Sequence, residues 1–409
     1  MLADSGGALP AGYRLRRDEL PSSADIVVIG AGLIGVTIAA RLAAAGRDVC
    51  LLDRVGPAAG ASSACEGNVL LSDKLPGPEL DLALRSLALW RAASERVASA
   101  IELEHKGGLV LARDAGELES LRLVAVRQRG AGVEVHDVGP EELRELEPEL
   151  AEGLAGGAFY PGDCQVQPMY AVAARVNDFL EAAGRLVTHA EVTGCERRRS
   201  SGAVSVVTSR GTVAVGSFVV NAAGPWSAEV AKRLDTSLPV TPRRGHVLVT
   251  EPVVDLIRHK VYEASYLGTI HATTADVSTS AVVESTKAGT VLLGSSREFV
   301  GFDRVIDRHV VAAIAAGAIR LFPRLSRVRL LRAYLGFRPA TPDRLPIIGF
   351  DAADGTVLHA TGHEGAGIGL AEATGELVEA LVGGTVPVVD PTPFSPARFT
   401  VAPGSSARG

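Results

Sequence analysis

Two short apolar runs, residues 24–29 and 49–52, lie on either side of a glycine-rich turn and a longer stretch rich in alanine and leucine. The runs contain almost no polar residue, which favours buried strands, and the stretch between them is typical of a helix. The pattern predicts a strand, a helix and a second strand from Ala24 to Asp53.

The pattern changes further along the chain. Amphipathic helices are predicted at three places: about 78–99, 169–184 and 308–321. Short strands dominate residues 100–160, where IELEH is one of them, and residues 243–297, where SAVVEST and TVLLGSS form a hairpin. Residues 355–382 return to a glycine-rich pattern of strand followed by helix. We therefore expect an α/β (α+β) fold with a discontinuous nucleotide-binding domain and a second domain built on an antiparallel sheet.

The expected domain limits follow from these changes. The nucleotide-binding domain comprises residues 24–99, 161–240 and 335–395, and the substrate-binding domain comprises residues 100–160 and 241–334. Residues 1–23 carry Gly, Pro, Ser and scattered Arg without a sustained apolar core, so we expect a mobile N-terminal extension and not a secretory signal. Residues 396–409 are expected to form a flexible tail.

The first glycine-rich turn has the spacing of a dinucleotide-binding site. Gly30 permits a tight turn, Gly32 lets the backbone approach a pyrophosphate, and Gly35 lets the helix pack close to the sheet. The amides at the start of the helix favour an anion. Asp53 ends the second strand, where a carboxylate can accept both hydroxyls of a ribose. This unit serves NAD and FAD alike, so it leaves the cofactor open.

Composition narrows the classes of partner and compartment. Lys and Arg number 41 and Asp and Glu 47, so the net charge is −6 and nucleic acid is excluded as an expected partner. The longest apolar stretches are far shorter than the ~20 residues of a transmembrane helix. The four cysteines (Cys50, Cys65, Cys164 and Cys195) form no CxxC pair, which argues against a metal site or an iron–sulfur cluster in this chain. A reduced, cytoplasmic compartment is expected.

Several further motifs accompany this unit: Ser62, Ser63 and Asn68 in the loop after Asp53 and Arg54, then NAAGPWS, GFRPATPDRLPIIG and TGHEGAGIGLAEATGEL. Together they resemble the D-amino-acid oxidase superfamily of FAD enzymes, which includes glycine oxidase, sarcosine oxidase and D-amino acid dehydrogenase. The resemblance spans Ala24 to Leu381. Within that group, GSSREFVGFD and GHEGAGIGL are most similar to the flavin subunits of hydroxyproline dehydrogenase, opine oxidase and hydrogen cyanide synthase.

The resemblance implies an FAD-binding Rossmann-like domain of the glutathione-reductase type. It also implies a set of cofactor-binding residues: Gly30, Ala31, Gly32, Leu33, Ile34 and Gly35 at the pyrophosphate, Asp53 and Arg54 at the ribose, Ser62, Ser63 and Asn68 in the next loop, Val192 at the adenine, Ala222, Ala223, Gly224 and Trp226 along the nucleotide half, and Gly362, His363, Gly365, Ala366, Gly367 and Ile368 at the flavin ring. Some relatives attach FAD to a cysteine where this chain has Gly336, so non-covalent FAD is expected.

The implied chemistry is oxidation of a small amino or imino acid (a D-amino acid, hydroxyproline, an N-substituted glycine or an opine) by hydride transfer to flavin N5. Arg338 precedes a proline that fixes the backbone, so its guanidinium can be aimed at the substrate carboxylate. Other pocket candidates lie on the expected substrate sheet: His246, Tyr262, Tyr266, Glu284 and Arg297.

The sequence leaves the electron acceptor open. Oxygen, or a partner chain that carries an iron–sulfur centre, a haem or a second flavin, would reoxidise the cofactor. Two other readings of the chain remain: an FAD subunit that relays electrons or serves assembly without catalysis, and an NAD enzyme, which would be colourless.

Overall fold

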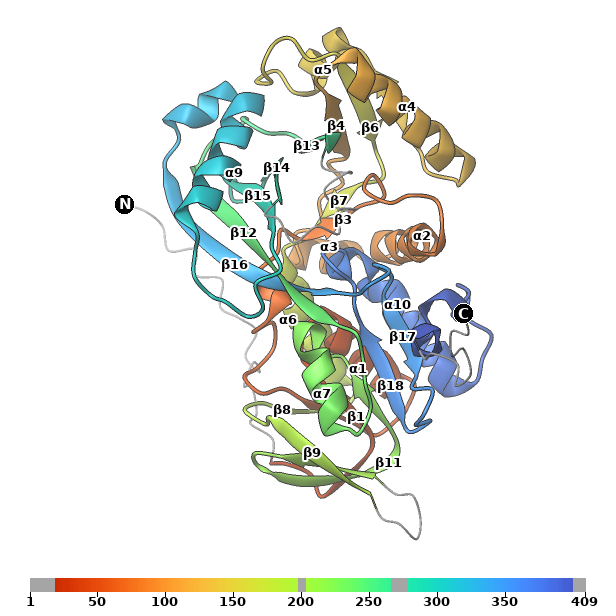
Figure 1. Ribbon diagram of the computed structural model, residues 1–409. Coiled ribbons are helices and arrows are strands. Elements are labelled where there is room, and N and C mark those ends of the chain that lie inside the picture. Colours follow the sequence, from red (N-terminus) through yellow and green to blue (C-terminus); the bar gives the residue numbers. More distant parts are fainter. Residues whose placement is uncertain (1–18, 198–203, 266–277, 400–409) are drawn as a thin grey trace, which may run out of the picture.

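The computed structural model describes residues 19–197, 204–265 and 278–399. Two large sheets form two halves of the molecule, and Figure 1 shows the first in the lower part of the view and the second in the upper part. A short strand pair, β3 (Asn68–Val69) with β7 (Cys164–Gln165), lies between them. This arrangement confirms the expected α/β (α+β) fold.

The first sheet contains the predicted nucleotide-binding pattern. Its strands are β1 (Ser23–Ile29), β2 (Val49–Leu52), β8 (Arg185–Val187), β9 (Val192–Arg197), β10 (Val204–Thr208), β11 (Gly211–Asn221), β17 (Ile347–Phe350) and β18 (Val357–Thr361). The order is β17-β18-β11-β1-β2-β8, and β9 and β10 extend from β11 as an antiparallel ladder. The neighbours β18, β11, β1, β2 and β8 run parallel. Their nearly continuous apolar sequences fit strands that are covered on both faces.

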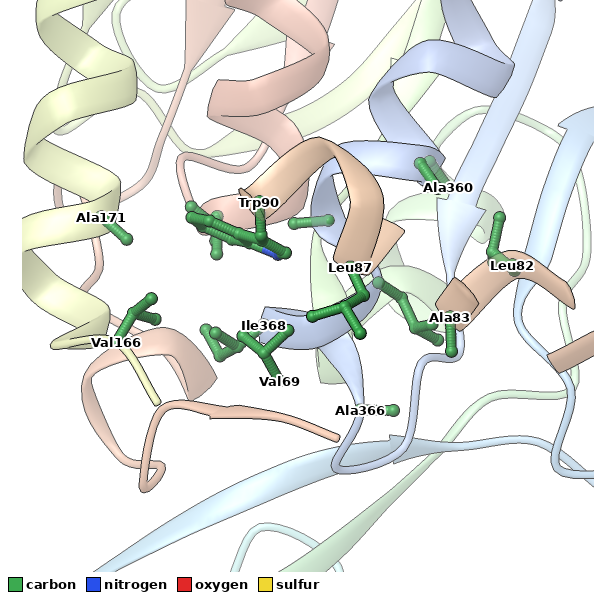
Figure 2. Packing of buried hydrophobic residues seen from close by; sticks show 14 of the residues in the cluster. Val69, Leu82, Ala83, Leu87, Trp90, Val166, Ala171, Ala360, Ala366 and Ile368 are labelled. Carbon is green, nitrogen blue, oxygen red and sulfur yellow. The ribbon is translucent and has the colours of Figure 1, made fainter. Parts of the chain in front are cut away.

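Three helices cover one face of the first sheet, α1 (Leu33–Ala44), α6 (Pro168–Glu181) and α10 (Gly367–Gly383), and α2 (Pro78–Arg91) lies on α10. α1 packs between α6 and α10, and α10 also packs against α2. Figure 2 shows the buried cluster under α2, where Trp90 and Leu87 approach Ile368 at the start of α10. The Trp90 indole donates a hydrogen bond to the Gly369 carbonyl at 3.2 Å. α2 therefore fixes the position of the amino end of α10.

The second sheet is formed by β4 (Gly108–Ala112), β5 (His136–Val138), β6 (Gly156–Tyr160), β12 (Thr241–Pro252), β13 (Lys260–Glu263), β14 (Ser278–Ser285), β15 (Thr290–Arg297) and β16 (Leu330–Ala340). Its order is β16-β12-β15-β14-β13-β4-β6-β5. The pairs are antiparallel as expected, except that β13 and β4 run parallel. The predicted hairpin of SAVVEST and TVLLGSS is confirmed as β14 and β15.

The other α-helices in the described part of the chain are α3 (Glu95–Ala100), α4 (Ala115–Gly130), α5 (Pro140–Leu146), α7 (Ser227–Arg233) and α9 (Arg308–Leu321). α9 packs on β14 and β15, and its apolar face forms a second core with them. α4 and α5 cover β6 at the far end of the sheet in Figure 1. Among the described residues, we found no helix with both the length and the apolar character needed to cross a membrane.

Local predictions differ from the structure at two places. The helix predicted over 78–99 is divided, because α2 ends at Arg91 and Ser94 accepts a hydrogen bond from the Val97 amide to begin α3. Residues 101–105, predicted as a strand, make an isolated bridge from Glu104 to Gln165. By contrast, the helix predicted over 308–321 is confirmed at both ends as α9.

The expected domain limits stay predictions, but sheet membership differs from them in places. β16 remains in the second sheet through Ala340, because its ladder with β12 continues past residue 335. The expected N-terminal extension overlaps β1 at Ser23, which pairs with Ala214; residues 1–18 lie outside the described residues. Residues 396–399 of the expected tail form a 3-10 helix, and Arg398 pairs with Asp343 there.

The turn between β1 and α1 is closely packed. Gly30 has a φ of +109°, a conformation that residues with a side chain rarely adopt. A Cβ added at Gly35 would lie 1.9 Å from the Gly30 carbonyl oxygen, so the helix touches the turn with its bare backbone. The two glycines together set the height of the α1 amino end above the sheet.

We expect Gly35→Ala to lower the melting temperature by a few degrees and to reduce the flavin retained after purification. The added methyl group collides with backbone, and overpacking of this kind costs about 1–3 kcal/mol. Gly130→Ala is the matched control, since a Cβ there has nothing within 4 Å. Thermal unfolding and the flavin-to-protein absorbance ratio check both variants. Equal melting temperatures and flavin contents for the two would contradict the packing argument.

Candidate active site

Three turns from distant parts of the sequence meet at one edge of the first sheet. Ile29 of β1 is in register with Asn221 of β11, and Asn221 is in register with His359 of β18. Because these strands are parallel, the turns that follow them emerge side by side. The carboxyl edge of a parallel sheet is the usual position for a ligand.

A cavity runs along this edge and continues to the second sheet. Most of the predicted cofactor residues line it: Gly30, Gly32, Leu33, Ile34, Asp53, Arg54, Ser62, Asn68, Val192, Ala222, Ala223, Gly224, Trp226, His363, Gly365, Ala366, Gly367 and Ile368. The three turns and the loop after β2 thus border one continuous space.

Four other predicted cofactor residues support the wall from behind. Ala31 is fully buried and its amide donates to Asp53. Gly35 faces the Gly30 carbonyl, and the Ser63 hydroxyl donates to the Gly60 carbonyl at 3.1 Å. Gly362 forms a turn with a φ of +79° in which an added Cβ would lie 2.6 Å from Thr341.

Asp53 and Ser62 organise the start of α1. One Asp53 oxygen accepts from the Ala31 amide at 2.8 Å, and the other accepts from the Val55 and Gly56 amides at 2.8 Å each. The Ser62 hydroxyl accepts from the Leu33 amide at 3.0 Å. These bonds fix the loop after β2 against the glycine-rich turn.

An aromatic stack joins the nucleotide side of the cavity to the second half of the molecule. The Arg54 guanidinium lies 3.9 Å from the centre of the Trp226 ring. The Trp226 ring also stacks parallel to the Phe302 ring, with the two centroids 5.2 Å apart. Phe302 in turn meets Phe337 of β16 edge to face. We call this set the Trp226 stack.

The amino end of α10 forms another wall. Residues 364–370 line the cavity, and among the described residues no side chain caps this helix. Its first amides and the positive end of its dipole therefore favour negative charge in the cavity. The His363 Nε2 atom lies 3.0 Å from the Thr374 hydroxyl, and burial lowers the pKa of His363 to about 3. His363 is thus neutral near pH 7.

Arg338 points along the wall where the two sheets meet. Its Nη1 donates to the Ser296 carbonyl at 2.9 Å. A Cβ at Gly245 would lie 2.1 Å from the same nitrogen, so the guanidinium passes directly over β12. Gly365 approaches the Arg338 side chain from the α10 side. The guanidinium is therefore half-buried and borders the cavity.

Of the other pocket candidates, Arg297 lines the cavity and is buried. Three of the described candidates, His246, Tyr262 and Glu284, lie outside the residues that line it, and their roles in the pocket stay predictions. His246 is fully buried and bonds to Ser296 and to the Asp307 amide, because it faces opposite to Gly245 and Val247 on β12.

The other two, Tyr262 and Glu284, are held inside the core. The Tyr262 hydroxyl donates to Ser72 at 2.7 Å in a buried network. Glu284 lies 3.4 Å from Lys260 Nζ, and burial raises its pKa to about 6. Tyr266 lies outside the described residues.

Sequence reasoning missed several residues that border the cavity, among them Glu66, Val247 and Glu364. Glu66 had a usable signal: it is an acidic residue in a loop of small residues, between the predicted cofactor residues Ser63 and Asn68. Val247 and Glu364 had none that distinguishes them from ordinary strand and turn residues.

Comparisons with known sequences show the family of this chain. The family profile described as FAD dependent oxidoreductase, DAO, matches residues 25–381. Glycine oxidase of Geobacillus kaustophilus is 30% identical over 381 residues, which cover 91% of this chain and 97% of that protein. Hydrogen cyanide synthase subunit HcnC of Pseudomonas aeruginosa is 31% identical over 345 residues, which cover 81% and 77%.

Solved structures show the same fold. The crystal structure of Geobacillus kaustophilus glycine oxidase matches with a TM-score of 0.84 and 29% identity, covering 93% of this chain and all of that one. L-proline dehydrogenase from P. horikoshii matches with a TM-score of 0.83 and 24% identity over 93% and 98% of the two chains, a likeness of fold. The chain therefore belongs to the DAO family of FAD-dependent oxidoreductases.

Proposed function

We propose that this enzyme oxidises a small amino or imino acid (a D-amino acid, hydroxyproline, an N-substituted glycine or an opine) and that Arg338 holds the substrate carboxylate. One observation carries the proposal: Arg338 borders the same cavity as the three nucleotide-type turns. An enzyme that used this cavity for the nucleotide alone would have no need of a positioned guanidinium at its far end.

The residues present fit FAD. The contact between Gly35 and Gly30 lets α1 begin close to the sheet, and Gly32 leaves bare backbone on the cavity wall where a pyrophosphate would lie. We assign Asp53 to a ribose, the Val192 backbone to an adenine and the amino end of α10 to the electron-rich edge of a flavin ring, because all three border the cavity. Gly336 packs against Ala64 where some relatives carry a cysteine, so the proposal is for non-covalent FAD.

FAD, when bound, supplies the acceptor for the hydride that leaves the substrate. The chain supplies position and charge. Arg338 presents parallel N–H donors that match a carboxylate, and its bond to Ser296 limits its rotation. The uncapped amino end of α10 favours negative charge on a group that lies in the cavity beside it. Because His363 is neutral and bonded to Thr374, we assign it a packing role and not that of a base.

The names of the relatives support an amino acid as the substrate. They include glycine oxidase and, at 28% identity over 440 residues, the D-amino-acid oxidase of Bradyrhizobium diazoefficiens. A second candidate function comes from HcnC, which is named as a subunit of a larger enzyme. On that alternative the chain is an FAD subunit that relays electrons to a partner protein or serves assembly without catalysis.

We expect the purified protein to be yellow and its visible band to bleach under anaerobic conditions with at least one of D-amino acids, D-hydroxyproline, sarcosine or opines. Acid precipitation should release FAD into the supernatant, because the flavin is not covalently attached. A yellow protein that bleaches with none of these compounds supports the non-catalytic subunit instead.

We expect Arg338→Ala to raise the KM for the carboxylated substrate about ten-fold or more, the equivalent of one lost charge-assisted hydrogen bond. The KM of Arg338→Lys should lie between the values for the wild-type protein and Arg338→Ala, because an ammonium keeps the charge but loses the paired donors. Arg327→Ala, an exposed arginine away from the cavity, is the control and should leave KM unchanged. Steady-state kinetics measure all three. An unchanged KM in Arg338→Ala would remove the proposed role.

A further inference from the structure

We propose that Glu66 binds the amino group of the substrate, so that the cavity holds an α-amino acid between opposite charges, its carboxylate on Arg338 and its ammonium on Glu66. This inference rests on the proposed function, because it adds a second anchor to the same site. It makes Glu66 a determinant of specificity for zwitterions over simple carboxylates.

The Glu66 carboxylate is buried with too few hydrogen bonds. Its side chain borders the cavity and is 10% exposed. Oε2 accepts from the Asn68 side-chain Nδ2 at 3.1 Å, while Oε1 has no hydrogen-bond partner among the described residues. A carboxylate offers about four acceptor positions, and burying them unfilled is unfavourable. A ligand that brings donors would relieve this deficit.

A second acceptor lies next to it. The Asn68 side chain also lines the cavity, and its Oδ1 is buried with no partner among the described residues. Two neighbouring acceptors, one of them charged, suit a group that carries several N–H donors and a positive charge. An ammonium has that character. A carboxylate would meet acceptors and repulsion at this position.

The neighbouring lysine does not satisfy Glu66 by itself. Lys260 Nζ lies 3.7 Å from Glu66 Oε2, beyond hydrogen-bond distance, and 3.4 Å from Glu284 Oε2. One ammonium is thus shared by two carboxylates. The arrangement holds Glu66 in place electrostatically and leaves its Oε1 without a donor.

β16 fixes the distance from Glu66 to Arg338. The Tyr334 hydroxyl donates to the Cys65 carbonyl at 3.3 Å, and a Cβ at Gly336 would lie 2.7 Å from the Ala64 side chain. These contacts bind the loop that carries Glu66 to one face of β16. Arg338 follows on the same strand, two residues after Gly336. The two anchors therefore belong to one rigid surface.

The two anchors also meet the same strand, β15. Glu66 Oε1 lies over Gly294, where a Cβ would come within 2.0 Å, and Arg338 donates to the Ser296 carbonyl, two residues further along. An α-amino acid carries its ammonium and its carboxylate on a single carbon, so it suits an acidic and a basic group that are neighbours along one strand.

The test uses two ligands of one shape that cannot be oxidised. 2-Aminoisobutyrate has no α-hydrogen, and pivalate carries a methyl group in place of its ammonium. Calorimetric titration of the FAD-loaded wild-type protein should give tighter binding of 2-aminoisobutyrate than of pivalate. Equal affinities, a preference for pivalate, or no binding of 2-aminoisobutyrate would overturn the assignment, and this arm depends on no variant.

Variants then locate the effect. Glu66→Gln keeps the shape and removes the charge, so the preference for 2-aminoisobutyrate should fall about ten-fold or more, while pivalate binding stays equal or improves. Glu66→Asp should restore part of the preference. Glu284→Gln, which removes a buried carboxylate behind Lys260, should leave the preference unchanged and so separates direct contact from a general change in charge.

Arg338→Ala distinguishes failure of this inference from failure of the proposed function. It should weaken both ligands by similar factors, since both carry a carboxylate. If it does so while Glu66→Gln leaves the preference unchanged, the carboxylate anchor stands and the Glu66 assignment is wrong. If pivalate binding is unaffected by Arg338→Ala, the proposed function itself loses its anchor.

Discussion

The site depends on three parallel strands that end at the same level. β18, β11 and β1 are neighbours, and Ile29, Asn221 and His359 are in register across them. Each strand is followed at once by a glycine-rich turn, so segments far apart in the chain meet without any need for long loops. A shift of one residue in this register would turn side chains to the opposite face and separate the turns. The cavity is a consequence of strand pairing.

Turns and helices that depend on neighbouring residues could be predicted from the sequence. The turn after β1 could be identified because Gly30 and Gly35 serve a steric requirement that no other residue meets, and α9 was located to the residue by its apolar periodicity. Small residues after apolar strands likewise predicted the turns at residues 221–224 and 362–369, and residues 222–224 and 363–369 line the same cavity. These features depend on short stretches of chain, so they can be predicted from the local sequence.

Tertiary contacts explain what could not be predicted. His246 and Tyr262 lie on the expected sheet, yet which face of a strand meets the cavity depends on its phase against distant neighbours, and both turn to buried partners. Glu284 likewise pairs with Lys260 inside the core. The sequence around Glu66 marks it as an acidic residue among predicted cofactor residues, but its burial against Gly294 and the packing of its loop on β16 depend on positions far from it in sequence. Whether a carboxylate oxygen is buried without a hydrogen-bond donor is decided by three-dimensional packing.

The Trp226 stack has a consequence for how the enzyme assembles. It joins Arg54, on the nucleotide side, to Phe302 and Phe337, which belong to the half of the molecule that carries the second sheet. Because these side chains pack directly on one another, the position of Arg54 at the nucleotide side and the position of β16, which carries Phe337 and Arg338, are set by one continuous set of contacts.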